Sequence, residues 1–236
     1  MARRVCVVLL LVVLSIYAGA TLAGHAQQQE QHRRLHREAD PTKQSFADVE
    51  RFRALFESSE RDAWQKPFEV IRALGVQPGA TVADIGAGTG YFARRGAVAV
   101  GREGTVFAAD FEPNMVVELR ASAERDGLAN LIPVLASADD PRLPDGTADL
   151  IFICNTWHHI ADRVAYARRL KRDLAPGGRV AIVDFYKHNV PVGPPPPHKL
   201  TAAEVQTEFE AAGYRPTKRI DELLPYQYVL VFEPTN

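Results

Sequence analysis

The sequence contains very little cysteine. Among its 236 residues only Cys6 and Cys154 are cysteines, and Cys6 lies in an apolar stretch near the start of the chain. If that first stretch is removed, Cys154 is the one remaining thiol, which excludes an internal disulfide and a cysteine metal cluster. Cys154 ends an apolar run, so we expect a buried and unreactive thiol.

An excess of either charge is also missing. Lysine and arginine total 28, aspartate and glutamate total 29, and the net charge is −1. Without a basic excess we expect no nucleic-acid partner. We expect no metal either, because the adjacent His158 and His159 and the distant His198 do not form a recognisable metal motif. The length and the 46% hydrophobic content fit one globular domain with a good core.

The N-terminus has the pattern of a secretory signal. Arg3 and Arg4 precede a nearly continuous apolar run over residues 5–17, and small residues follow as far as Ala26. This order predicts a signal peptide over residues 1–26 and an exported, periplasmic protein after cleavage. An uncleaved membrane anchor with a cytosolic domain is the alternative, because the uncharged run is just long enough to span a bilayer. A true start further downstream would leave a soluble enzyme.

A polar segment follows the apolar run. It is rich in Gln, His, Arg and Glu, has almost no large apolar residue, and predicts a disordered linker over residues 27–45. The globular domain is therefore expected over residues 46–236. It should begin with helices over 46–55 and 68–74, where apolar residues recur at helical spacing.

The most informative stretch reads Val-Ala-Asp-Ile-Gly-Ala-Gly-Thr-Gly over residues 82–90. An apolar run containing Asp84 ends in three closely spaced glycines, and a helical pattern begins at Tyr91. This is the pattern of a strand, a tight turn and a helix start, as in a doubly wound α/β sheet. Glycines allow positive φ and let a ligand approach the backbone, and the first amides of the helix then face that ligand.

The glycine spacing favours one class of cofactor. It is G-x-G-x-G, whereas a dinucleotide fingerprint is G-x-G-x-x-G. With the preceding acid, this spacing resembles motif I of the class I S-adenosylmethionine (SAM) methyltransferases. Three later segments resemble further motifs of this family, in the order in which the family has them: Thr105–Asp110, Leu143–Cys154 and Leu174–Asp184. The resemblance covers roughly residues 60–234. The sequence is most similar to small-molecule members that resemble quinone-biosynthesis C-methyltransferases.

The resemblance implies an α/β, Rossmann-like fold with SAM as the cofactor. It implies seven strands in the order 3-2-1-4-5-7-6, with strand seven antiparallel and helices on both faces. The sequence itself shows the alternation of strands and helices that a parallel sheet needs. The expected strands are 80–85, 104–109, 131–135, 148–154, 178–184, 215–224 and 228–232. A capping box at Thr201–Glu204 predicts a helix start there.

The resemblance also implies which residues bind the cofactor. Asp110 ends the second strand, where a carboxylate accepts both ribose hydroxyls, and Asp84 would face the methionine end. Phe111 and Met115 would flank the adenine, and Asp139 or Asp140 would meet its amino group, unless both are turn residues. The full predicted cofactor set is Asp84, Gly86, Gly88, Thr89, Gly90, Asp110, Phe111, Met115, Asp139, Asp140 and Asn155.

Candidate catalytic and substrate residues follow the later strands. His158 and His159 come just after the fourth strand, where a histidine near neutral pKa could remove a proton, although such a pair can equally line the pocket. Trp64 is a candidate lid residue or an ordinary packing aromatic. The predicted substrate residues are Trp64, Trp157, Tyr186 and His198.

These patterns favour a SAM-dependent methyltransferase of a small molecule. The alternative is a protein that binds SAM or a nucleoside without transferring a methyl group, and an oxidoreductase using NAD conflicts with the glycine spacing. The turn after the fourth strand lacks the Asn/Asp-Pro-Pro-aromatic motif of enzymes that methylate nucleobases or glutamine. Arsenite methylation is set aside, because those enzymes hold arsenic with several cysteines. The methyl acceptor and the oligomeric state do not follow from the sequence.

Overall fold

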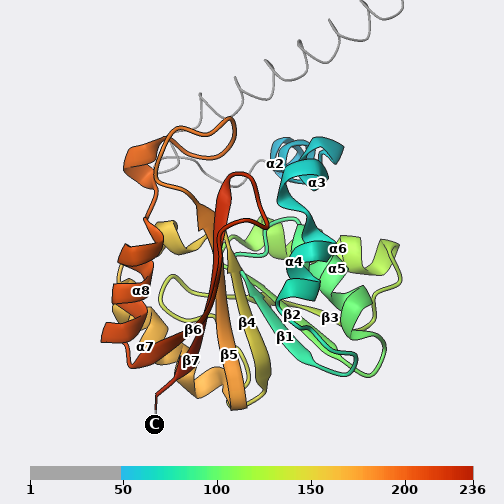
Figure 1. Ribbon diagram of the computed structural model, residues 1–236. Helices are drawn as coiled ribbons and strands as arrows, with labels where there is room; N and C mark the ends of the chain where they lie inside the picture. The colour runs from blue at the N-terminus through green and yellow to red at the C-terminus, as the bar shows by residue number, and fades with distance from the viewer. Residues whose placement is uncertain (1–48, 236) are drawn as a thin grey trace, which may run out of the picture. The chain divides into compact units, whose positions relative to one another are not determined.

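The computed structural model describes residues 49–235. The predicted signal segment and linker, and the first residues of the predicted first helix, lie outside this range. Within it, helices alternate with strands in the expected order (Figure 1). The helices are α2 (Val49–Phe56), α3 (Ser59–Gln65), α4 (Pro67–Ala73), α5 (Tyr91–Val100), α6 (Pro113–Arg125), α7 (Arg163–Asp173) and α8 (Ala202–Ala211). None of these helices is long and apolar enough to cross a membrane.

Seven strands form one mixed sheet. They are β1 (Thr81–Ile85), β2 (Thr105–Asp110), β3 (Leu131–Leu135), β4 (Ala148–Cys154), β5 (Leu174–Phe185), β6 (Tyr214–Ile220) and β7 (Gln227–Pro234). Their order is β3-β2-β1-β4-β5-β7-β6, and β7 is antiparallel to both neighbours. The predicted fold class and strand order are therefore confirmed. Pro133 and Pro216 lie in β3 and β6, the two edge strands, where the missing N–H costs no ladder hydrogen bond.

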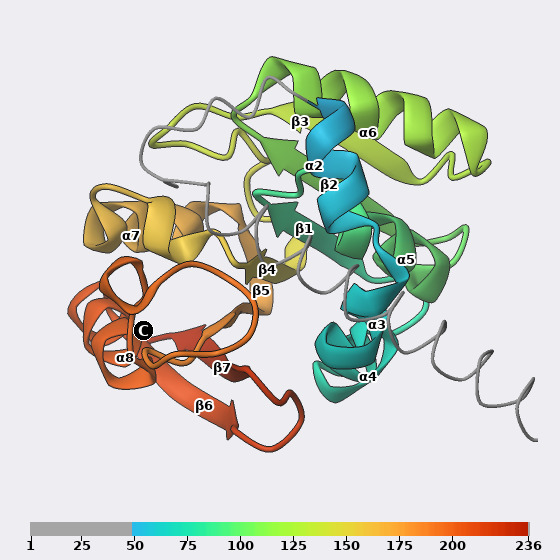
Figure 2. The same cartoon turned by 90° about the horizontal axis from the view of Figure 1, so that it is seen from above.

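Apolar side chains cover both faces of the sheet. One buried cluster joins α4, α5 and α6 to one face, and a second joins α7 and α8 to the other. The central strands read as continuous buried runs, as expected for parallel strands covered on both sides. Helices α2 and α3 lie near the top of the view in Figure 1, and Figure 2 shows the same domain from above.

Three elements differ from the sequence expectation. Helix α3 was not predicted, because its seven residues do not repeat apolar side chains at helical spacing. Contacts with the rest of the domain stabilise it, and its last residue, Gln65, is buried. Strand β5 begins at Leu174 and not at 178, because Leu174 pairs with Ala148 before an irregularity in the ladder. Strand β6 ends at Ile220, so the hairpin loop is longer than expected.

Two helix starts agree with the sequence. The Thr201 side chain accepts the amide of Glu204, and the Glu204 carboxylate accepts the amide of Thr201, which is the predicted capping box. Asp162 caps α7 by accepting the amide of Ala165 at 3.1 Å. These capping contacts fix where α7 and α8 begin, and so they fix the lengths of the loops that follow the carboxyl ends of β4 and β5.

Candidate functional site

The glycine turn after β1 has the geometry that the sequence predicts. Gly86, Gly88 and Gly90 have φ values of 71°, 56° and 92°, in the left-handed region that favours glycine. A side chain at Gly86 is also excluded by space, because a Cβ there would lie 2.2 Å from the Thr156 hydroxyl oxygen. The turn after β1 therefore packs directly against the segment after β4.

Asp110, at the end of β2, is hydrogen-bonded to this turn. Its carboxylate accepts the Gly88 amide at 2.8 Å and the Glu112 amide at 2.9 Å. The amides of Gly86 and Ala87 bond to the carbonyl of Ala109, next to it in the chain. Burial raises the pKa of Asp110, and the two backbone hydrogen bonds oppose that rise. Asp110 thus fixes the turn that was predicted to hold the cofactor.

The buried carboxylate of Asp110 fits the ribose of SAM. Each of its oxygens accepts one amide, and a carboxylate offers about four lone-pair positions. Acceptor positions therefore remain, as the predicted contact with the ribose hydroxyls requires. Gly88 keeps the backbone of the turn uncovered by a side chain of its own, and the Phe56 ring at the end of α2 lies 3.5 Å from where a Cβ would be.

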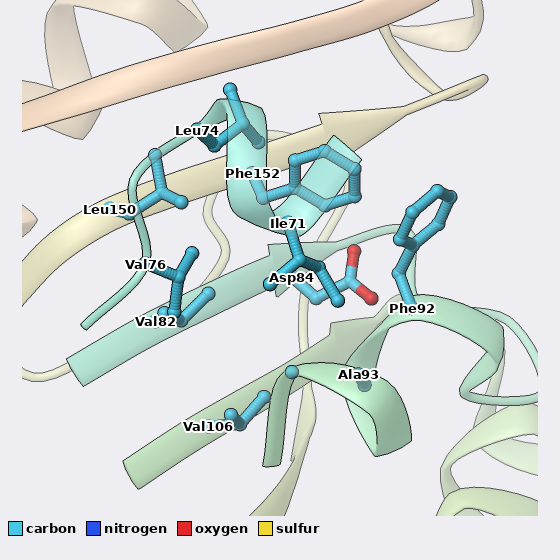
Figure 3. Close-up of a pocket in the computed structure, with 11 residues that line it drawn as sticks. Ile71, Leu74, Val76, Val82, Asp84, Phe92, Ala93, Val106, Leu150 and Phe152 are labelled. Carbon is cyan, nitrogen blue, oxygen red and sulfur yellow. The ribbon is translucent and has the colours of Figure 1, made fainter. Parts of the chain in front are cut away.

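Asp84 lies deeper, beside a cavity of about 20 Å³ between β1, α4 and α5 (Figure 3). Its carboxylate lies between the rings of Phe92 and Phe152, and the other walls are mostly aliphatic side chains. The cavity has room for about one water molecule. Burial raises the pKa of Asp84 to about 7, and the positive charge of Arg61 from α3 opposes this rise.

Helices α2 and α3 form a cap over the glycine turn. Glu57, just after α2, accepts the Thr89 hydroxyl at 2.7 Å and also pairs with Arg94 of α5. Arg61 lies 3.8 Å above the ring of Tyr91, the first residue of α5. The sequence indicated Trp64 as a candidate lid residue in this region but did not indicate Glu57 or Arg61, because their partners are distant in the sequence.

The other predicted cofactor residues occupy different environments. Phe111 is largely exposed at the start of α6, whereas Met115 is fully buried. The carboxylate of Asp140 bonds to Arg169 at 2.7 Å, and Asp139 bonds to the Ser137 hydroxyl at 2.8 Å. These contacts stabilise the loop after β3.

Asn155 has a left-handed backbone, with φ of 56°, directly after β4. Its side-chain oxygen accepts a hydrogen bond from Gln227, which in turn accepts one from Gln65 of α3. Both glutamines are fully buried. This chain of amides connects α3 to the carboxyl end of β4, and nothing in the local sequence indicated it.

The histidine pair has an acidic partner that the sequence did not single out. Nδ1 of His158 lies 2.9 Å and 3.0 Å from the two carboxylate oxygens of Asp184, which is near the end of β5. The ring centroids of His158 and His159 are 4.2 Å apart, and the rings are tilted by 43° to each other. The sequence signal that could have revealed Asp184 is its position after the apolar run of β5, at the edge where ligands bind.

The predicted substrate residues separate into two groups. Trp64 faces the rings of Phe185 and Tyr226, at 5.9 Å and 6.2 Å between centroids, at the same edge as the histidines. The Tyr186 hydroxyl donates to the carbonyl of Asp221. His198 lies close enough to His159 for its charge to lower the pKa of that residue. Trp157 is different, as described next.

Trp157 lies in the hydrophobic core and not at the edge of the site. It is fully buried, packs against Phe209 with 4.8 Å between ring centroids, and donates its indole N–H to Glu208 at 2.9 Å. The structure therefore gives Trp157 a packing role between β4 and α8. Sequence reasoning grouped it with the histidines because it is adjacent to them, although its side chain points to the other side of the segment.

Comparison with known proteins agrees with this geometry. Residues 82–178 match the family described as Methyltransferase domain. The chain is 30% identical over 125 residues to a ubiquinone/menaquinone biosynthesis C-methyltransferase, UbiE, of a Shewanella species, which is 52% of this chain and 49% of that protein. It is 30% identical over 128 residues to a demethylmenaquinone methyltransferase of Listeria welshimeri, covering 54% and 53%. The chain spans about half the length of the curated relatives it matches.

A solved structure matches over a greater length. A SAM-dependent methyltransferase from Aquifex aeolicus superposes with a TM-score of 0.75 and 27% identity, covering 80% of this chain and 98% of that one. Together, the sheet order, the glycine turn and these matches show that the chain has the fold of SAM-dependent methyltransferases, with a methyltransferase-domain match over residues 82–178, and they indicate S-adenosylmethionine as the cofactor.

Proposed function

We propose that this protein transfers the methyl group of SAM to a small-molecule acceptor. The observation that carries the proposal is the hydrogen bond between Asp110 and the Gly88 amide, which joins a buried carboxylate at the end of β2 to the glycine turn after β1. When bound, SAM supplies a methyl group that is already activated as part of a sulfonium. The protein then has to position the acceptor, exclude water and remove a proton.

The acceptor binds, in this proposal, between the cap helices and the ends of β4 and β5. Trp64, Phe185 and Tyr226 form an aromatic wall there, which suits a planar ring. The names of the curated relatives support a quinone precursor as the kind of acceptor. We therefore propose a hydroxylated aromatic ring as the acceptor class.

The test uses the full chain, isothermal calorimetry and methyl-labelled SAM. We expect binding of S-adenosylhomocysteine but not of NAD, and transfer of label to 1,4-naphthoquinol. Binding without transfer to any acceptor in a panel of hydroxylated aromatics would support the alternative of a SAM-binding protein. If neither SAM nor S-adenosylhomocysteine binds, the proposal is wrong.

We also propose, from the N-terminal sequence, that the protein is exported and its signal removed. N-terminal sequencing of the protein from its native cells tests this. A first residue near Gln27 is expected. An intact Met1 in the membrane fraction would instead indicate an anchor, and a soluble cytosolic protein that starts beyond the apolar run would contradict both.

A further inference from the structure

His158 and Asp184 form a buried pair at the edge of the sheet. Their side chains are 4% and 0% exposed, and the Phe185 amide also donates to Oδ1 of Asp184, at 2.8 Å. An ionised carboxylate only accepts hydrogen bonds, so the proton between the two side chains belongs to Nδ1 of His158. Nε2 then keeps its lone pair, and within residues 49–235 it has no hydrogen-bond partner.

This pair lies at the carboxyl ends of two neighbouring parallel strands. His158 follows β4, and Asp184 is the last residue but one of β5. Thr156, two residues before His158, touches Gly86 of the glycine turn after β1. The pair is therefore at the edge of the sheet where ligands bind in folds of this kind, the same edge as the glycine turn.

His159 is the weaker candidate for a base. Desolvation and the neighbouring His158 lower the pKa of His159 to about 4, while Asp184 opposes this shift and His198 adds to it, although His159 itself is exposed. A general base works best when its pKa is near the working pH. Lys199 is the other charged group here; its ammonium donates to the carbonyl of His188 and so cannot accept a proton.

Building on the proposed function, we infer that Nε2 of His158 removes the proton that the acceptor loses on methylation, and that Asp184 is the residue that positions His158. The acceptor's O–H, or the ring C–H after methylation at carbon, gives its proton to Nε2. The electron pair left on the acceptor is used in the new bond to the methyl group or in restoring the aromatic ring, and the cofactor departs as a neutral thioether. Asp184 stabilises the imidazolium that results.

The variant Asp184→Asn tests the positioning role because its effect on the imidazole follows from the structure. The Phe185 amide will hold the Asn carbonyl oxygen in place of Oδ1, which puts the Asn NH₂ in place of Oδ2, 2.9 Å from Nδ1 in the wild type. A protonated Nδ1 would then face this donor as well as the carbonyl oxygen at 3.0 Å, so the Nδ1–H tautomer, and with it the lone pair on Nε2, loses its support. A residue with only a structural role would not change the tautomer.

The measurements are nitrogen-15 NMR of the histidine rings and turnover of 1,4-naphthoquinol with labelled SAM, both on the full chain. We expect the Nδ1–H tautomer of His158 in the wild type and the Nε2–H tautomer in Asp184→Asn. We expect kcat to fall by about 10²–10⁴ in His158→Gln, with KM little changed. His188→Gln, an exposed histidine outside the pair, is the matched control and should retain kcat.

Each part of the inference can fail separately from the proposed function. An Nε2–H tautomer in the wild type overturns the assignment of His158 without any variant, so poor folding of a variant does not decide the matter. Full kcat in His158→Gln also overturns it. If a wild type that binds S-adenosylhomocysteine does not methylate 1,4-naphthoquinol, the acceptor class is wrong, whereas a failure to bind S-adenosylhomocysteine rejects the proposed function itself.

Discussion

Replacing Asp110 by asparagine should separate the two tasks that this residue performs. In the structure its two oxygens each accept one backbone amide, from Gly88 and Glu112. Asparagine keeps one oxygen and replaces the other with an NH₂ group, which cannot accept a hydrogen bond. One buried amide N–H therefore faces another donor, and the glycine turn loses one of its supports.

The structural effect should be measurable as a loss of stability. A buried donor left without a partner costs about 1–3 kcal/mol. For a domain of this size, 1 kcal/mol changes the melting temperature by about 2–4 °C, so we expect a decrease of about 2–12 °C. The affinity for S-adenosylhomocysteine should fall by about ten- to a hundredfold, because a charge-assisted hydrogen bond contributes about 1.5–3 kcal/mol.

Differential scanning calorimetry and titration calorimetry measure the two effects. Asp149→Asn is the matched control, because Asp149 also accepts a backbone amide, that of Thr81 at 2.8 Å, but at the opposite end of the strands. This control should retain its affinity. An unchanged affinity in Asp110→Asn would refute the assignment to the ribose, and an unchanged melting temperature would refute the support of the turn.

Three further predictions concern other parts of the domain. Gly86→Ala should lose about 1–3 kcal/mol in urea unfolding through overpacking, because its Cβ would lie within 2.2–2.8 Å of the Thr156 side chain; Thr156→Ala in the same chain should restore part of the loss. Trp157→Phe should lose about 1–3 kcal/mol through the hydrogen bond to Glu208 but keep its affinity for S-adenosylhomocysteine, and a large loss of affinity would contradict the core position. Burial raises the pKa of Asp84 from 3.8 to about 7, so the folded state binds more protons than the unfolded state in this range. The contribution of Asp84 to the free energy of unfolding should therefore fall as pH rises from 4 to 7. If Asp84→Asn leaves the pH slope unchanged, this prediction is wrong.

The local sequence determined much of the fold. The apolar runs, the glycines after β1 and the capping box before α8 each act over a few residues, so their patterns can be read directly. The alternation of strands and helices then leaves few possible topologies, because crossover connections are right-handed. The strand order itself came from the family resemblance. Helix α3 could not be read in this way, since its stability depends on contacts with distant residues.

By itself, the sequence determined the α/β class, the glycine turn and the position of Asp110 at the end of β2, because each depends on backbone geometry that residue type controls. Only the tertiary structure decided which side chains meet. It joined His158 to Asp184, 26 positions apart, and placed Trp157, the neighbour of His158, in the core. Adjacent residues in an irregular segment can point to opposite sides, and residues on different strands meet where the strands end together. The chemistry of this edge therefore depends on packing that no single stretch of sequence specifies.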